Sequence, residues 1–438
     1  MLEIAPGHPV KLARAWLWLG VVALIGAGLL AILLVLSRTP GIQDVFPLKD
    51  FFRSALIVHV DLSVAIWFMA FAAVLWSAAG SDGYALLGRA AFWLATAGTV
   101  LMIVSPFLPD SQPLLNNYIP MLQQPVFYVS LWLCAAGFGL AVVRALLTTW
   151  PSKPFAEPLR LGVFIGAVAG AFAFIAFLWS WLTIPAGSGQ TYFEMVFWGG
   201  GHVLQYQHSL LMVVAWLWLA DYLGAKPVAS PAVLSTLLVV AALPLLAAPV
   251  IYFGWADDSP MHMIYFAKLM KWGHPTMVPL ILLALAGLWQ LRALSHPAKS
   301  AFVASFVLFA TGGILGYLIS GVNVVIPAHY HGAIVGVTLA FMGLAYALLP
   351  QLGFRAVEGR MALLQPYIYG GGQLLHVAGL AWSGGYGVQR KVAGADQMLT
   401  TLPQKMGMGM MGLGGVIAII GGLLFVIVCL KAMWPRQK

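Results

Sequence analysis

Long apolar stretches constrain this chain more than any other feature of its sequence. Of its 438 residues, 61% are hydrophobic and 8% are charged, whereas a soluble domain carries about 25% charged residues. Windows of roughly 20 apolar residues are long enough to cross a bilayer as helices, and the chain contains such windows at about 14–37, 54–79, 85–106, 122–148, 160–183, 191–221, 231–253, 262–291, 300–321, 327–350, 364–384 and 408–433. The sequence therefore predicts an all-α, polytopic membrane protein with about twelve transmembrane helices, in which residues 1–438 form a single membrane domain.

The charge and the cysteines exclude several other classes of protein. The formal net charge is +9, but the basic residues are scattered between the apolar windows. We expect them to determine topology in the lipid bilayer rather than to bind nucleic acid. The two cysteines, Cys134 and Cys429, both lie inside apolar windows, so we expect neither a disulfide framework nor a thiolate metal site.

The distribution of Lys and Arg predicts how the chain is oriented. If the N-terminus is cytoplasmic and the sides alternate at each window, more Lys and Arg fall on the inner side than on the outer side. The short outer loops near 106–121, 184–190 and 322–326 contain neither residue. This bias satisfies the positive-inside rule and predicts a multi-pass protein of the cell inner (cytoplasmic) membrane.

Five of the ten histidines share one depth in the predicted membrane. The second, sixth, eighth and tenth windows run from outside to inside in this orientation, and their first few turns contain His59, His202, His274, His329 and His331. An ionisable ring in hydrocarbon is costly and usually functional. We interpret the shared depth as a pair of metal centres near the outer face.

The segment Pro327-Ala-His-Tyr-His-Gly is the strongest local signal. Successive helical residues turn by about 100°, so the rings of His329 and His331 leave the helix on nearly opposite faces. Neutral imidazole is an axial ligand of haem iron, and two haems flanking one helix explain the spacing. The alternative is that both rings cap the helix start and contact water or carbonyl groups.

His59, in Leu56-Ile-Val-His-Val-Asp-Leu-Ser, is the candidate for the opposite axial ligand of one of these haems. Ligation by two imidazoles leaves the iron without an open position, which suits electron transfer rather than gas binding. The alternative is a polar pair between His59 and Asp61 at the membrane surface.

The segment Trp198-Gly-Gly-Gly-His-Val-Leu-Gln-Tyr places His202 and Tyr206 on one helical face, at i and i+4. Such a pair can combine a metal ligand with a proton donor. The three glycines allow a neighbouring helix or a flat cofactor to approach closely. The alternative for Tyr206 alone is an interfacial aromatic residue.

With these motifs, the chain resembles subunit I of the haem-copper oxidase superfamily over almost its whole length. The matching features are the twelve windows, the histidine of the second, the His-x-x-x-Tyr of the sixth and the His-x-His of the tenth. A late glycine-rich stretch, Leu375–Gly384, which we expect to be a loop, and the basic pair Arg390-Lys391 beyond it also match. Span lengths and the GGGHVLQY segment resemble most the compact oxidase and nitric oxide reductase branches.

The resemblance implies a role for each of these residues. By this resemblance, His59 and His331 ligate a low-spin haem and His329 ligates a high-spin haem. Arg390 and Lys391 hold haem propionates. His202 ligates a non-haem metal, and Tyr206 is the tyrosine that some members link covalently to that histidine.

One departure from the family pattern concerns the non-haem metal. The family normally supplies two further copper ligands as adjacent histidines near the outer end of the seventh span, but Pro249–Asp258 contains no histidine. The donors nearest in the sequence are Asp257, Asp258 and His274. Carboxylate and imidazole together suit iron better than copper, as in the superfamily's nitric oxide reductases, whereas Tyr206 is typical of oxidases. The two aspartates can also belong to a solvated outer loop.

The resemblance implies a membrane oxidoreductase that reduces a diatomic gas. We favour NO slightly, with a cytochrome c oxidase reducing O2 as the alternative. The cofactors are two haems, low-spin and high-spin, and a non-haem iron or copper, and electrons arrive at the outer side. Because the chain has no cupredoxin or cytochrome c domain, we expect a partner subunit that carries one.

Two non-enzymatic classes compete with this interpretation. One is a haem electron carrier or sensor that lacks the second metal. The other is a transporter, which is disfavoured because the histidines share one depth and because we expect no broken helices at the midplane.

Overall fold

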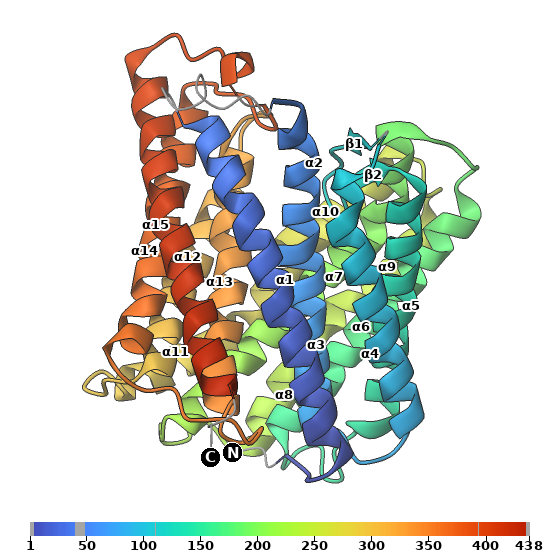
Figure 1. Ribbon diagram of the computed structural model, residues 1–438. Helices are drawn as coiled ribbons and strands as arrows, with labels where there is room; N and C mark the ends of the chain where they lie inside the picture. Colours follow the sequence, from blue (N-terminus) through green and yellow to red (C-terminus); the bar gives the residue numbers. More distant parts are fainter. Residues whose placement is uncertain (1–3, 40–48, 110, 393, 435–438) are drawn as a thin grey trace. The chain divides into compact units, whose positions relative to one another are not determined.

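The computed structural model describes residues 4–39, 49–109, 111–392 and 394–434 (Figure 1). Its elements are α1 (His8–Arg38), α2 (Lys49–Val60), η1 (Asp61–Ile66), α3 (Trp67–Ala79), α4 (Ala85–Val104), η2 (Ser105–Phe107), β1 (Gln112–Leu114), β2 (Met121–Gln123), α5 (Pro125–Thr148), α6 (Pro158–Thr183), α7 (Gly189–Tyr222), α8 (Pro231–Ala242), η3 (Leu243–Leu246), α9 (Ala247–Gly254), α10 (Pro260–Gly273), η4 (His274–Met277), α11 (Val278–Gln290), α12 (Pro297–Tyr317), α13 (Val325–Leu348), α14 (Arg360–Gly385), η5 (Gly394–Gln397) and α15 (Leu402–Met433). The two short strands pair antiparallel, with Gln112 opposite Gln123.

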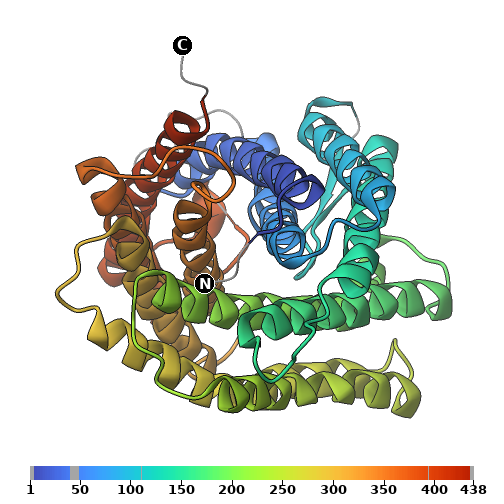
Figure 2. The ribbon, with the colours of Figure 1, turned by 90° about the horizontal axis from the view of Figure 1, so that it is seen from below.

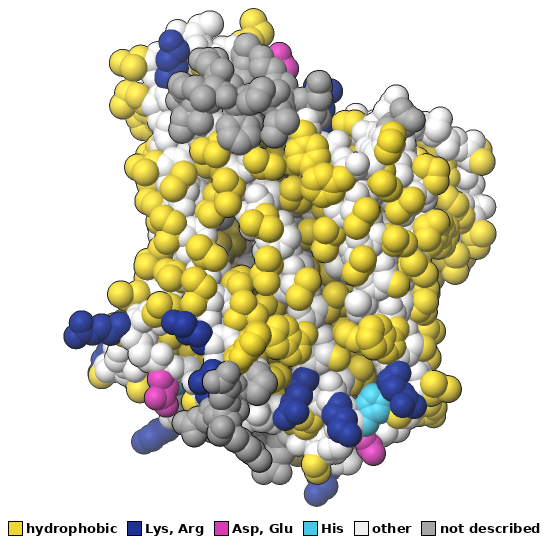
Figure 3. Space-filling model, in the orientation of Figure 1, with side chains coloured by type: hydrophobic (Ala, Val, Ile, Leu, Met, Phe, Trp, Pro, Cys, Tyr) yellow, Lys and Arg dark blue, Asp and Glu magenta, His cyan; other side chains and the backbone are white. Residues whose placement is uncertain are grey.

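The helices confirm the prediction of an all-α polytopic protein. Among the described residues, 11 helices or runs of consecutive helices are long and apolar enough to cross a membrane. The 26-residue helix α14 corresponds to the remaining predicted window. In Figure 3 hydrophobic side chains cover the middle of the visible face, and the visible Lys and Arg lie above and below this apolar region. Lipid cannot bond exposed backbone groups, so a helix, which satisfies them internally, is the form in which such segments span a bilayer.

The chain divides into two compact units. Unit 1 consists of Met1–Gly20 and Ala65–Arg292, and unit 2 of Val21–Val64 and Ala293–Lys438. In unit 1, α4 packs on α5 and α6 on α7; in unit 2, α12 packs on α13 and α14 on α15, as the end-on view in Figure 2 shows. The expectation of a single domain over 1–438 stays a prediction.

Three of the spans are interrupted, so our expectation of unbroken helices is wrong. A 3₁₀ segment, η3, separates α8 from α9 at Pro244, and another, η4, separates α10 from α11 at Pro275. Proline lacks an amide hydrogen and clashes with the carbonyl four residues earlier, so it breaks the helical ladder. Between α2 and α3 the chain forms a π-helical turn, η1.

The glycine-rich stretch Leu375–Gly384 is helical, so its assignment to a loop is wrong. It lies within α14, and its Gly379, like Gly372 earlier in the same helix, serves helix packing rather than chain reversal. A Cβ atom at Gly379 would lie 2.4 Å from the amide nitrogen of Met411, and one at Gly372 would lie 2.4 Å from that of Ala418. Both contacts are with backbone atoms of α15, so small residues here let two helices approach closely.

This close approach predicts that Gly372→Ala destabilises the protein. The new methyl group collides with the backbone of α15, and overpacking of this kind costs about 1–3 kcal/mol. Gly371→Ala is the matched control, because a Cβ atom there meets nothing within 4 Å. Thermal unfolding in detergent should show a lower midpoint for Gly372→Ala alone. Equal midpoints for the two variants would contradict the packing described.

Candidate haem and metal site

His59 is anchored by the backbone of a neighbouring helix in unit 2. Its Nδ1 lies 2.8 Å from the carbonyl oxygen of Ala27 in α1. A carbonyl only accepts, so Nδ1 carries the hydrogen and Nε2 has the lone pair. Because the hydrogen bond goes to Ala27, the alternative of a His59–Asp61 pair is not the arrangement found.

His329 and His331 face different helices, as their spacing predicts. Nδ1 of His329 donates to the carbonyl of Gly312 in α12, at 2.7 Å. The ring of His331 lies instead beside the ring of His376 in α14, with centroids 4.7 Å apart and planes inclined by 59°. The bond of His329 to a carbonyl uses only Nδ1, so Nε2 keeps the lone pair with which imidazole ligates a metal.

His376 is a site residue that our sequence reasoning did not select. Its side chain is buried, and its Nδ1 donates to the carbonyl of Met411 in α15, at 2.9 Å. A signal was present, because His376 lies within the eleventh apolar window, in the half that the predicted orientation places toward the outer face. The assignment of this stretch to a loop hid it.

Two arginines of unit 2 lie near the tenth-window histidines. Nε and Nη2 of Arg38 are buried, and no described residue accepts a hydrogen bond from them. Arg38 and Arg390 are both close enough to Tyr330 to act on it electrostatically. Guanidinium groups bind carboxylates strongly, so this corner suits an anionic group such as a haem propionate. Lys391, the neighbour of Arg390, has a positive φ of 61°.

The donors of unit 2 therefore fit a haem held by two imidazoles. His59 presents a ring whose Nδ1 is bonded to a backbone carbonyl, the usual preparation of a metal-ligating histidine. His59 is also close enough to His331 to act on it electrostatically. The orphaned guanidinium nitrogens of Arg38 match the carboxylates of such a cofactor.

In unit 1, His202 is enclosed by aromatic rings. It is 4% exposed, and its Nδ1 donates to the carbonyl of Trp198 at 2.7 Å. The rings of Tyr118 and Trp198 lie 4.7 Å from the His202 ring, and that of Phe266 lies 5.9 Å away. Desolvation raises the pKa of the Tyr118 phenol well above its usual range, and nearby Glu194 adds to the rise, so this ring stays neutral.

The three glycines before His202 are covered by side chains. Cβ atoms at residues 199, 200 and 201 would lie between 2.2 and 2.3 Å from side-chain atoms of Tyr252, Phe177 and Tyr118, respectively. The absence of side chains at these three glycines therefore makes room for aromatic side chains. These aromatic side chains fill the space next to the α7 backbone.

Tyr206 holds together the two broken spans of unit 1. Its hydroxyl donates to the carbonyl of Ala241 at 2.6 Å, and it lies 3.2 Å from both the carbonyl of Gly273 and Oγ1 of Thr276. Ala241 and Gly273 lie where α8 and α10 give way to 3₁₀ turns, so their carbonyls are at the helix breaks. Polar side chains commonly satisfy backbone groups that such breaks release.

Both ring nitrogens of His274 are already bonded. Nδ1 donates to the carbonyl of Met270 at 2.8 Å, and Nε2 lies 3.0 Å from Oγ of Ser209. Its ring also contacts that of Tyr206, with centroids 5.0 Å apart. Ligation of a metal through Nε2 would require the loss of the Ser209 bond.

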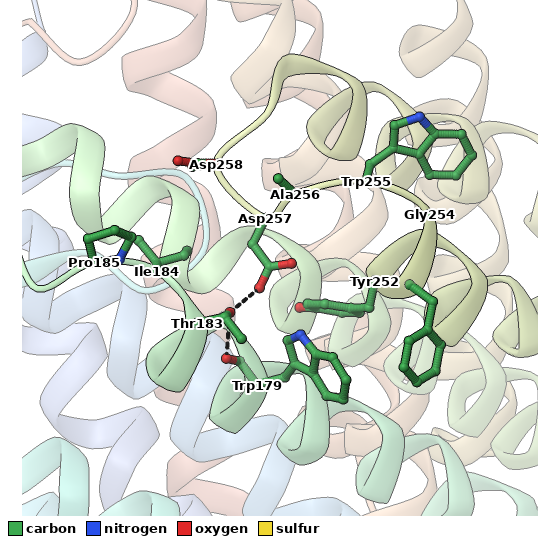
Figure 4. Close-up of a pocket in the computed structure, with 11 residues that line it drawn as sticks. Trp179, Thr183, Ile184, Pro185, Tyr252, Gly254, Trp255, Ala256, Asp257 and Asp258 are labelled. Atoms are coloured by element: carbon green, nitrogen blue, oxygen red, sulfur yellow. Dashed lines mark hydrogen bonds between the residues drawn. The ribbon is translucent and has the colours of Figure 1, made fainter.

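Asp257 and Asp258 differ in their surroundings (Figure 4). Asp257 is 7% exposed and accepts a hydrogen bond from the hydroxyl of Thr183, whereas Asp258 is exposed. Beside Asp257 lies the buried ring of His262, whose Nε2 is 3.9 Å from the Asp257 carboxylate. Neither nitrogen of His262 has a hydrogen-bond partner among the described residues.

Unit 1 does not present a complete ligand set for a second metal. Within the described ranges, no three His, Cys, Asp or Glu side chains are grouped so that they could hold a metal ion. His202 and His262 each offer a free imidazole nitrogen, but both lie against the ring of Phe266, with centroid separations of 5.9 and 4.9 Å.

The fold and these side chains define a class of protein. It is a multi-pass helical membrane protein in which several histidine rings are anchored on backbone carbonyls and two histidines of one helix face different neighbouring helices. Comparison with known proteins agrees with this class. Residues 11–424 match the family model described as cytochrome c and quinol oxidase polypeptide I. The chain belongs to this family, the catalytic subunit of the haem-copper oxidase superfamily.

Relatives and a solved structure extend the comparison. An uncharacterized protein of Rickettsia prowazekii is 29% identical, with 98% of this chain and 97% of that protein aligned. An uncharacterized protein of Aquifex aeolicus is 28% identical over 80% of this chain and 88% of its own length. A heme-copper terminal oxidase dimer solved by cryo-electron microscopy has the same fold, with a TM-score of 0.72 and 15% identity over 99% of this chain and 86% of that one.

The bonds of Tyr206 predict that Tyr206→Phe destabilises the protein. Removing the hydroxyl takes away the shorter of the two side-chain hydrogen bonds to the carbonyl of Ala241, which keeps only Oγ1 of Thr276 at 3.5 Å, and such a loss costs about 1–3 kcal/mol. Tyr84→Phe serves as the control, because Tyr84 is 56% exposed. We expect the thermal midpoint to fall for Tyr206→Phe and to stay constant for Tyr84→Phe. A Tyr206→Phe protein as stable as the parent would show that the hydroxyl does not secure the broken spans.

Proposed function

We propose that this chain is the catalytic subunit of a respiratory terminal reductase that reduces a diatomic gas. His59 and His331 would hold a low-spin haem and His329 a high-spin haem, and the two haems would supply the electron-transfer chemistry. The observation that carries this proposal is the His-x-His of α13, whose two rings contact different helices. Bis-imidazole ligation suits electron transfer, and an iron with a single imidazole keeps a position for gas.

The residues of unit 2 bind and orient the low-spin haem in this proposal. The haem supplies the reversible one-electron chemistry. The carbonyl of Ala27 fixes the tautomer and ring orientation of His59, so that Nε2 is the ligating atom. Arg38 and Arg390, with Lys391, neutralise the haem carboxylates.

The choice of gas depends on the second metal centre. His202 is its proposed first ligand and Tyr206 the proposed proton donor, with Asp257, Asp258 and His274 as further candidates. The lack of adjacent histidines near the outer end of α9 favours NO, reduced to N2O at a non-haem iron. Tyr206 favours the alternative, a cytochrome c oxidase with copper.

A second candidate function is that of a non-catalytic haem electron carrier or sensor. One observation favours it, namely that the described residues of unit 1 assemble no group of three metal donors. The two hydrogen bonds of His274 also favour this function, because they occupy both ring nitrogens.

The proposal includes a location and a partner. The chain lies in the cell inner membrane with a cytoplasmic N-terminus, which places the proposed haem ligands in the outer half. We expect an electron-donating subunit with a cupredoxin or cytochrome c domain on that side, and a gas, O2 or NO, as the substrate.

Substitution of the axial histidines tests the assignment of the haems. We expect His59→Ala to lose the low-spin haem and keep the high-spin one, and His329→Ala to do the reverse. Visible and electron paramagnetic resonance spectra with haem quantification measure both. His208→Ala, a buried histidine outside the proposed sites, should keep both haems. Retention of a normal low-spin signal by His59→Ala would refute the assignment.

Metal content and gas consumption separate the two functions. A reductase contains two haems plus one iron or copper per chain and consumes NO or O2 with an electron donor present, whereas a carrier contains two haems only and consumes neither gas. Metal analysis of the purified protein, combined with NO and O2 electrode assays, distinguishes these outcomes. Faster consumption of O2 than of NO would reverse our preference for NO.

A further inference from the structure

The three proposed axial ligands are not anchored in the same way. His59 and His329 each donate Nδ1–H to a backbone carbonyl, at 2.8 and 2.7 Å. The ring of His331 forms no hydrogen bond with any described residue, although it is partly buried like those of His59 and His329. A metal-ligating histidine almost always donates its second ring N–H to a partner that fixes its orientation. His331 therefore needs a partner that a backbone carbonyl does not provide.

His376 lies in the right place to be this partner. Its ring centroid is 4.7 Å from that of His331, so a turn of the His331 ring would be enough to direct its Nδ1 toward His376. Because Nδ1 of His376 donates to the carbonyl of Met411 at 2.9 Å, its Nε2 has a lone pair and can accept a hydrogen bond. In this tautomer, Nε2 of His376 can accept a hydrogen bond from a ring N–H of His331.

The position of His376 is itself fixed by tight packing between α14 and α15. A Cβ atom at Gly414 would lie 2.3 Å from the backbone nitrogen of His376, and one at Gly415 would lie 3.4 Å from its Nδ1. The helix that carries His376 is therefore held against the helix that carries its acceptor, Met411. A ring held in this way can impose an orientation on a neighbouring ring that lacks such an anchor.

We propose that His376 is the positioning residue of the axial ligand His331. In the haem-bound protein, Nδ1–H of His331 donates to Nε2 of His376, and Nδ1–H of His376 donates to the Met411 carbonyl. This relay of two imidazoles and one carbonyl replaces the direct carbonyl anchors of His59 and His329. The inference rests on the proposed function, because it requires His331 to ligate a haem.

The relay has two consequences for the low-spin haem. It fixes the plane of the His331 ring, and it makes that imidazole a more basic ligand, because its N–H is donated to an acceptor. A more basic axial ligand favours ferric iron and lowers the reduction potential. Loss of the acceptor on His376 therefore raises the potential of the low-spin haem and changes the anisotropy of its paramagnetic resonance signal.

Two substitutions at one position separate this role from simple packing. His376→Phe keeps a ring of similar size but removes the acceptor. His376→Gln supplies an amide, whose oxygen can accept from His331 and whose NH2 can donate to the Met411 carbonyl. The readouts are haem content, the low-spin paramagnetic resonance spectrum and a potentiometric titration of both haems in the purified full-length protein. His208→Phe, a buried histidine packed on Phe68 in unit 1, is the matched control.

We expect His376→Phe to keep both haems, to shift the low-spin potential upward and to alter the low-spin spectrum, while the high-spin haem keeps its parent potential. His376→Gln should restore parent values, and His208→Phe should not depart from them. Parent potential and spectrum in His376→Phe, with a full complement of haem, would overturn the inference. Equal shifts in His376→Phe and His376→Gln would also overturn it, because they would indicate packing alone.

The failure of the proposed function has a different signature. A parent protein without a low-spin haem, or a His331→Ala variant whose low-spin signal is unchanged, would remove His331 as a ligand and with it the proposed function. If the parent protein contains both haems and His376→Phe changes neither the low-spin potential nor the low-spin spectrum, only the role of His376 is refuted. The proposed function then stands.

Discussion

The hydrogen bond from an imidazole Nδ1 to a backbone carbonyl is the interaction on which the candidate site depends. His59, His202, His329 and His376 all form it, at 2.7–2.9 Å. Each bond satisfies one polar atom inside an apolar bundle, where an unpaired group is costly. Each also selects one tautomer, so that Nε2 has the lone pair. The same bond thus stabilises the fold and prepares the ring for a metal.

The helix interruptions show how the bundle tolerates irregular backbone at membrane depth. Proline breaks the ladder at two places in unit 1, which leaves carbonyls that lipid cannot satisfy. Tyr206, buried on α7, bonds to carbonyls at both breaks. Tyr206, which lies one helical turn after His202, therefore forms structural hydrogen bonds of its own. Any role of Tyr206 in catalysis has to be compatible with these bonds.

The sequence was sufficient for the helices and insufficient for the contacts between them. Hydropathy located every long helix because a bilayer requires about twenty apolar residues for each crossing. The angular rule for helices likewise placed the rings of His329 and His331 on different faces. Neither rule predicts which neighbour a ring meets, so the bonds of His274 to Ser209 and the contact of His331 with His376 were missed. The glycines of α14 misled us because glycine favours both loops and close helix packing, and only the partner helix distinguishes the two.

The division of the donors between the two units has a consequence for how the cofactors are held. His59, His331, His376, Arg38 and Arg390 all belong to unit 2, so every side chain assigned to the low-spin haem comes from one packing unit. Its geometry is then set by contacts among α1, α2, α13, α14 and α15. The donors considered for a second metal, from His202 to His274, belong to unit 1 and are not grouped for a metal. In this proposal, the residues that would hold the low-spin haem and the donors considered for a second metal are therefore positioned by separate sets of helix contacts.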